Sequence, residues 1–177
     1  MPIVPGVHRL GPGDATLLVR TGRAGAAARA GHDLVLEVTA WTATLEISDS
    51  PSLTLDADAT SLRVRSGTGG IQALGDDDKA NIETTIDDDV LKRTGIAFRS
   101  TTARADGATI DVQGELELAG RTHPLAFPLT VGADGALSGS ATVSQSDWGM
   151  KPYSALFGTL KVADEVQVVF EGTLPAG

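Results

Sequence analysis

The stretch IDVQGELELAGRTHPLAFPLTV, residues 110–131, decides the fold because apolar and polar side chains alternate on both sides of a glycine turn. Its second half places Leu125, Phe127, Leu129 and Val131 on one face, and its first half follows the same rule. Successive side chains of a strand point to opposite faces. Each half is therefore a strand with one buried and one wet face, which is typical of an antiparallel sheet.

Short strand-like segments separated by turn signals continue along the rest of the chain. We expect strands at residues 7–10, 15–21, 34–47, 52–59, 62–66, 96–104, 108–118, 123–131, 137–146 and 159–171. The Asp-Gly pairs at 106–107 and 134–135 are typical of tight hairpins. Within residues 34–47 the apolar phase changes, and a bend near residues 39–41 would restore a common inward face. Closely spaced strands and hairpins favour a barrel or a sandwich.

Two segments depart from the β pattern. Residues 75–93 predict the main helix, with Asp76 as its cap and an apolar stripe at Ile82, Ile86 and Val90. At its end, Lys92 and Arg93 compensate the charge of residues 87–89, and Gly95 can stop the helix. The alanine-rich residues 22–30 predict a short helix. The main helix is expected to lie against the barrel surface or across one of its ends.

Length and composition exclude several classes of protein. The chain has 177 residues, which predicts a single domain over residues 1–177, and 41% of them are apolar. Its formal net charge of −9 disfavours nucleic-acid binding and attraction to an anionic membrane surface. Cysteine is absent, so thiolate sites are excluded. Neither a signal peptide nor an apolar run of about 18 residues is found, so we expect a cytoplasmic protein without stable membrane insertion.

Five segments in a fixed order resemble the YceI-like family. They are ATSL (59–62), the acidic helix, IAFRST (96–101), GELELAGRTHP (114–124) and SDWGM (146–150). The resemblance spans roughly residues 7–170. It implies a mainly β, lipocalin-like antiparallel barrel of about eight strands with helical cover. It also implies an internal pocket that holds a polyisoprenoid or another long-chain lipid.

The inward faces of the expected strands are compatible with such a pocket. Large and small residues mix at positions 53, 55, 57 and 59 and at positions 137, 139, 141 and 143. Small inward side chains leave a barrel of about eight strands room for one slender ligand. Aromatic residues make up 4% of the chain, so the lining suits a flexible hydrocarbon better than a flat ring. The alternative from the residues alone is that these faces pack together into a filled core.

Candidate ligand-binding residues follow from this interpretation. They are His32, Trp41, Phe98, Phe127, Trp148, Tyr153 and Phe157, with Arg63, Arg65 and Lys151 as a basic rim for a headgroup. The aromatic loop at residues 148–158 is interpreted as a lid or as a hydrophobic plug. His32, beside Asp33, suits a headgroup, a haem or a metal ion, and the alternative is a capping or turn histidine.

The sequence favours a binding protein over an enzyme. No nucleophile elbow or close metal-ligand spacing is present, so we expect no catalytic residues, no metal site and no cofactor other than a bound isoprenoid-like lipid. The acidic runs at 76–78 and 87–89 lack the pattern of a calcium loop. Two alternatives stay open. One is a haem protein or small enzyme that uses His32, and the other is a packed-core barrel that acts through protein association, for example as a homodimer.

Overall fold

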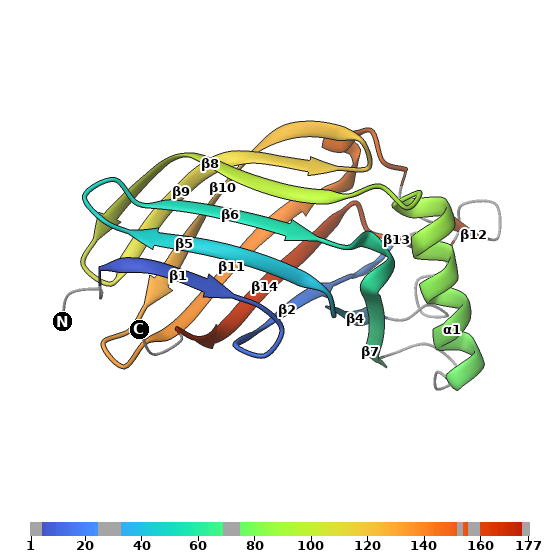
Figure 1. Ribbon diagram of the computed structural model, residues 1–177. Helices are drawn as coiled ribbons and strands as arrows, with labels where there is room; N and C mark the ends of the chain where they lie inside the picture. Colours follow the sequence, from blue (N-terminus) through green and yellow to red (C-terminus); the bar gives the residue numbers. More distant parts are fainter. Residues whose placement is uncertain (1–4, 25–32, 69–74, 152–153, 156–159, 175–177) are drawn as a thin grey trace.

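The computed structural model describes residues 5–24, 33–68, 75–151, 154–155 and 160–174, and its main feature is a curled antiparallel sheet (Figure 1). Within these ranges the sheet has eleven strands, in the order β1-β5-β6-β8-β9-β10-β11-β14-β2-β4-β7. Their bounds are β1 Gly6–Leu10, β2 Ala15–Arg20, β4 Asp33–Val38, β5 Trp41–Ile47, β6 Ser52–Ala57, β7 Leu62–Thr68, β8 Ile96–Asp106, β9 Thr109–Leu118, β10 Arg121–Val131, β11 Ala136–Ser144 and β14 Glu165–Thr173. The mainly β class is therefore confirmed.

The strand count exceeds the expected eight because one long hairpin bends in both of its strands. Strand β4 runs into β5 through Thr39 and Ala40, and β6 runs into β7 through Asp58 and the short 3-10 helix η2 (Ala59–Ser61). Strand β5 pairs with β6, whereas β4 pairs with β7. Treating each bent strand as one strand and setting aside the edge strand β1 leaves eight. The two halves of the hairpin thus join opposite ends of the sheet order and curl the sheet.

The bend lies where the apolar pattern changes phase, so the prediction for residues 39–41 is confirmed. Val38 and Trp41 are both buried, while Thr39 and Ala40 between them are exposed. The two bent strands are tied together by hydrogen bonds from the Thr39 N–H to the Ser61 carbonyl (3.1 Å) and from the Asp58 N–H to the Ala40 carbonyl (3.0 Å). Both strands therefore turn together and keep their apolar faces inward.

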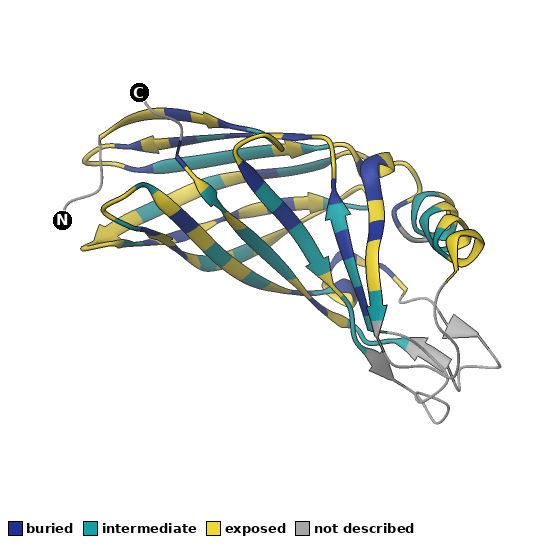
Figure 2. Cartoon of the chain, turned by 90° about the horizontal axis from the view of Figure 1, so that it is seen from below, coloured by how far each residue is buried: buried dark blue, intermediate teal, exposed yellow. Residues whose placement is uncertain are grey.

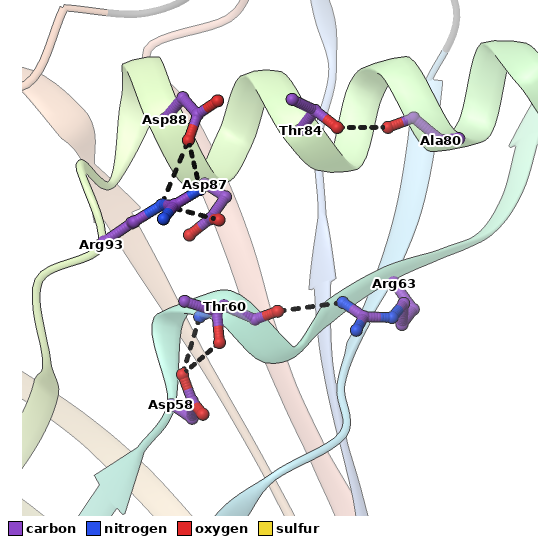
Figure 3. Close-up of polar contacts among 8 residues, drawn as sticks. All are labelled: Asp58, Thr60, Arg63, Ala80, Thr84, Asp87, Asp88 and Arg93. Atoms are coloured by element: carbon purple, nitrogen blue, oxygen red, sulfur yellow. Dashed lines mark hydrogen bonds and ion pairs between the residues drawn. The ribbon is translucent and has the colours of Figure 1, made fainter.

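A carboxylate cap supports this bend from the solvent side. The Thr60 N–H and hydroxyl donate to the same Asp58 carboxylate oxygen, at 2.9 and 2.7 Å (Figure 3). These hydrogen bonds, the one from the Thr60 side chain foremost, lower the pKa of Asp58 below its ordinary value of 3.8. Arg63 donates to the Thr60 carbonyl in the same view (3.0 Å). The short helix η2 is therefore fixed at both of its ends.

The main helix, α1 (Asp76–Thr85), lies across one end of the curled sheet, and a π-helical turn, η3 (Ile86–Val90), extends it (Figure 1). Gly75 rather than Asp76 is the N-cap, because its extended backbone lets its N–H donate to the Asp78 carboxylate (3.0 Å). A carboxylate oxygen of Glu83 accepts from the Val64 N–H of β7 at 2.8 Å. This hydrogen bond fastens the helix to the edge of the sheet.

The helix ends earlier than Gly95, at an ion-pair cluster. Lys92 and Arg93 have positive φ angles of 53° and 55°, which reverse the chain without a glycine. Arg93 reaches back to Asp87 (3.2 Å) and Asp88 (3.0 Å), as Figure 3 shows. The expected charge compensation by Arg93 is confirmed, and it offsets the crowding of carboxylates at the negative end of the helix.

Two further sequence predictions need correction. The expected short helix at 22–30 falls mostly outside the described residues, and within its described part, residues 22–24, Arg23–Ala24 form strand β3. The expected strand at 159–171 is broken at Ala163 and Asp164 into β13 (Leu160–Val162) and β14. Asp164 turns the chain because its carboxylate accepts from the Ser146 N–H (2.8 Å) and hydroxyl (2.6 Å). Strands β3, β13 and β12 (Ser154–Ala155) form a second, small sheet.

Burial alternates along the strands, and this alternation separates an apolar interior from a polar exterior (Figure 2). Strand β9 shows it best, since Ile110 and Val112 are fully buried while Asp111 and Gln113 are exposed. Across the part of the chain that is described, the helices lack the length and apolar character needed to span a membrane. The interior of the curled sheet is therefore the candidate location for a functional site.

Candidate functional site

The interior of the curled sheet contains a cavity of about 530 Å³. Every strand of the eleven-stranded sheet contributes to its wall, and α1 and η3 contribute Ile82 and Ile86. The volume falls within the range of roughly 300 to 1,000 Å³ that is usual for small-molecule sites. The expectation of a hollow interior, rather than a filled core, therefore agrees with the geometry.

The lining is apolar and uncharged. Of the lining residues that the structure describes, five have polar side chains and none has a charged one. The inward faces derived from the sequence supply much of the wall, at Leu53, Leu55, Ala57, Leu137, Gly139, Ala141 and Val143. Ala59, assigned to the same face, is buried but does not reach the cavity. Contact with such a wall would remove the apolar surface of a ligand from water, which is favourable.

Two of the predicted aromatic residues form part of this wall. Phe98 of β8 and Phe127 of β10 both line the cavity, and their ring centroids lie 5.3 Å apart. Phe98 has room because Gly114 on β9 lacks a side chain, and a Cβ atom there would lie 2.7 Å from the Phe98 Cζ atom. A register shift between Ser100 and Thr102 accompanies this close approach.

The two tryptophans are buried but do not line the cavity. The Trp148 indole N–H donates to the Leu116 carbonyl at 2.7 Å, and its ring contacts that of His123. Trp41 packs edge-to-face on Phe170, a lining residue, with centroids 5.4 Å apart. Its indole N–H is buried without a hydrogen-bond partner among the described residues.

The expected basic rim does not reach the cavity either. Arg63 and Arg65 project from β7 as exposed side chains, on the face opposite Leu62 and Val64. Arg63 donates to the Thr60 and Leu62 carbonyls, and Arg65 pairs with Glu37 at 2.7 Å. Lys151 is exposed. These cations therefore stand outside the apolar wall.

Three predicted site residues, His32, Tyr153 and Phe157, lie outside the described residues. Their roles remain predictions. Among the described residues, no three His, Asp or Glu side chains come together in a way that could hold a metal ion.

The structure adds polar lining residues that the sequence interpretation missed. Asn81 and Thr85 of α1 and Gln145 of the 3-10 helix η4 (Gln145–Trp148) line the cavity, Gln145 from a buried position, Thr85 from a half-buried one and Asn81 from an exposed one. The sequence did indicate Asn81 and Thr85, because they are four residues apart and lie beside the apolar stripe on the same side of the helix. The stripe alone was recognised because apolar spacing is the stronger pattern.

An antiparallel sheet curled around an uncharged apolar cavity defines a barrel-type protein with a candidate internal site. A family model of the YceI-like domain matches residues 30–174. The chain therefore belongs to the YceI-like family. Among curated protein sequences, none matches this chain.

Solved structures share the fold at low sequence identity. BcnA of Burkholderia cenocepacia is 19% identical, with a TM-score of 0.67 over 92% of this chain and 96% of that one. The YCEI protein of Campylobacter jejuni is 12% identical, with a TM-score of 0.58 over 80% and 85%. A domain of Saccharophagus degradans described as polyisoprenoid-binding and implicated in plant cell wall breakdown is 8% identical, with a TM-score of 0.52 over 96% and 99%. At these identities the likeness is one of fold.

Proposed function

We propose that this protein is a non-enzymatic binding protein that holds a polyisoprenoid or another long-chain amphiphilic lipid inside the curled sheet. The observation that carries the proposal is the uncharged, apolar cavity of about 530 Å³. Burial of each methylene group in such a wall contributes about 0.8 kcal/mol. The description of the related Saccharophagus domain as polyisoprenoid-binding supports the same ligand class.

The lining also favours binding over catalysis. Its polar side chains are two threonines, a serine, an asparagine and a glutamine, which are not acid–base groups at neutral pH. Phe98 and Phe127, the aromatic candidates from the sequence that line the wall, support the proposal that a ligand is held there. The alternative of a haem protein or an enzyme depends on His32, which lies outside the described residues.

Native mass spectrometry of freshly purified protein, followed by organic extraction, tests this function. We expect a stoichiometric hydrocarbon-chain ligand, or, after removal of bound lipid, saturable uptake of one from a panel of polyprenols, isoprenoid quinones and fatty alcohols. A bare mass together with no uptake from the whole panel would contradict the proposal. A Soret band in the purified protein would instead favour the haem alternative.

A further inference from the structure

Four of the five polar lining residues, Thr21, Asn81, Thr85 and Gln145, lie at the end of the cavity that α1 covers, whereas Ser140 lies in the middle of β11. Glu83 of α1 binds the Val64 N–H, and Val64 lies opposite Leu36, which in turn lies opposite Val19. Thr21 lies two residues after Val19. Its N–H donates to the carbonyl of Leu34, near the start of β4. Gln145 lies at the same end of the cavity as Thr21. The Gln145 N–H donates to the Asp164 carbonyl, and the N–H of Ala163, next to Asp164, donates to the carbonyl of Gly22, next to Thr21.

The opposite end of the interior is closed by apolar packing. Strand β8 leaves the α1 end at Ile96 and reaches the far end at Asp106, where Ile110 and Val131 are buried. Ile110 has no exposed surface and Val131 is 2% exposed, yet neither lines the cavity. Ile47 is likewise buried and excluded from the lining. A chain-shaped ligand in this cavity would therefore place its apolar tail toward this closed end and its headgroup under α1.

Asn81 and Thr85 are the polar residues at the α1 end whose side chains are wholly unpaired among the described contacts, whereas Thr21 and Gln145 each have one hydrogen bond already made. Thr21 already accepts from the Leu34 N–H (3.2 Å), and Gln145 already donates to the Ala163 carbonyl (3.2 Å). Among the described contacts, the Asn81 amide and the Thr85 hydroxyl have no hydrogen-bond partner, and both residues line the cavity. They are four residues apart on one helix and so lie side by side.

The charge around this pair disfavours an anionic headgroup. Residues 76–90 include seven carboxylates and one ammonium group. Arg93, at the end of this segment, is engaged by Asp87 and Asp88. Lys92 adds one further positive charge at the end of the segment. On the edge strand beneath the helix, Arg65 is engaged by Glu37, and Arg63 donates to the Thr60 and Leu62 carbonyls, so the carboxylates still outnumber the cations around the helix. A phosphate or diphosphate under α1 would therefore meet net repulsion, which bulk salt screens.

We propose that Asn81 and Thr85 form a headgroup subsite for an uncharged hydrogen-bonding group, a hydroxyl or a carbonyl, at the end of the lipid chain. The Asn81 amide supplies both a donor and an acceptor, and the Thr85 hydroxyl supplies a second of each. This inference rests on the proposed function, because it assigns the orientation and headgroup class of a ligand in the same cavity.

The test compares three twenty-carbon probes: geranylgeraniol, the corresponding hydrocarbon without the hydroxyl group, and geranylgeranyl diphosphate. Their affinities are measured by displacement of the fluorescent apolar dye N-phenyl-1-naphthylamine from protein freed of lipid. We expect the wild-type protein to bind the alcohol about fivefold more tightly than the hydrocarbon. We also expect it to bind the diphosphate more weakly than the alcohol, with a difference that narrows as salt is added.

The variants are Asn81→Leu, Thr85→Val and their combination. In the combined variant we expect equal affinities for the alcohol and the hydrocarbon, with the hydrocarbon affinity not reduced. Thr84→Val is the matched control, because Thr84 lies on the same helix, does not line the cavity and donates to the Ala80 carbonyl (3.0 Å, Figure 3). It should retain the fivefold preference. Far-ultraviolet circular dichroism verifies that each variant is folded.

The outcomes separate this inference from the function on which it rests. An unchanged alcohol preference in the folded combined variant, or tighter binding of the diphosphate than of the alcohol, would overturn the subsite while leaving the lipid-binding function intact. Displacement of the dye by none of the three probes would reject both. Loss of preference in Thr84→Val as well would assign the effect to the helix as a whole and also overturn the subsite.

Discussion

Trp41 and Trp148 are two buried indoles with opposite hydrogen-bonding states. Trp148 satisfies its N–H with the Leu116 carbonyl, whereas the Trp41 N–H has no partner among the described residues. A buried polar group without a partner costs about 1 to 3 kcal/mol in lost hydration. The two side chains therefore contribute differently to stability, although both are nearly inaccessible to solvent.

This difference gives a prediction at the scale of single residues. Trp41→Phe and Trp148→Phe remove a similar amount of apolar volume, but the first removes an unsatisfied donor and the second breaks a made hydrogen bond. We expect Trp148→Phe to lower the free energy of unfolding by about 2 kcal/mol more than Trp41→Phe does. Urea denaturation followed by circular dichroism measures both. Equal losses would show that the Trp41 N–H is satisfied in solution.

The alternation of apolar and polar residues predicted much of the cavity wall, because every second side chain of a strand points inward. Leu53, Leu55 and Ala57 all line the cavity as the alternation implies. The sequence could not tell that Trp41 would pack beside the cavity rather than face it, because alternation gives a face and not a depth. Alternation placed Arg63 on the outer face but could not show its hydrogen-bond partners, because these are the Thr60 and Leu62 carbonyls, which the bend brings close.

Among the elements, the bent hairpin formed by β4, β5, β6 and β7 shows how a small cap supports a change of direction. Asp58 binds both donor groups of Thr60, and these bonds favour the ionised carboxylate and lower its pKa. A lowered pKa in the folded state means that the unfolded state binds the proton more readily. The stabilising contribution of Asp58 is therefore present above pH 3.8 and is lost as the pH falls through the lower folded-state pKa.

Asp58→Asn isolates this contribution, since the amide can still accept hydrogen bonds but carries no charge. We expect the wild-type protein to be more stable than the variant near pH 6, and the difference to shrink as the pH drops below 3.8. Urea titrations at a series of pH values give the difference in free energy of unfolding directly. A difference that is constant over this range would mean that the charge of Asp58 plays no part.

The helix shows which features of an element the sequence can supply. Its apolar stripe was predictable, and Ile82 and Ile86 do face the cavity. Its cap and its end were not, because Gly75 caps through the Asp78 carboxylate and the helix stops at two residues with positive φ. Both details depend on local side-chain contacts that compete with the simple preferences for Asp at a cap and Gly at an end.

At the scale of the whole molecule, an unfilled interior has a cost in stability, because the side chains around it lack packing partners. Ala141 lines the cavity from β11, while its neighbour Thr142 points outward and is exposed. The two positions offer a matched pair for testing whether the interior is where a ligand is held.

Ala141→Met is expected to fill part of the cavity and to displace about two methylene groups of a bound chain, which weakens lipid binding roughly tenfold. Its free energy of unfolding without ligand should not fall, because the added side chain enters empty space. Thr142→Met places the same methionine side chain on the outside of the sheet and should leave binding unchanged. Dye displacement and urea denaturation measure the two effects. Equal affinities in the two variants would place the ligand elsewhere.

The hydrogen bond between Glu83 and the Val64 N–H also bears on how molecules of this protein avoid one another. Strand β7 is an edge strand of the sheet. The unpaired amide groups of an edge strand can form hydrogen bonds with a strand from another molecule. The Glu83 carboxylate accepts a hydrogen bond from one of these amide groups, that of Val64. Helix α1, which carries a net negative charge, packs against the same strand. The helix that covers the cavity thereby also obstructs the addition of a foreign strand along the β7 edge.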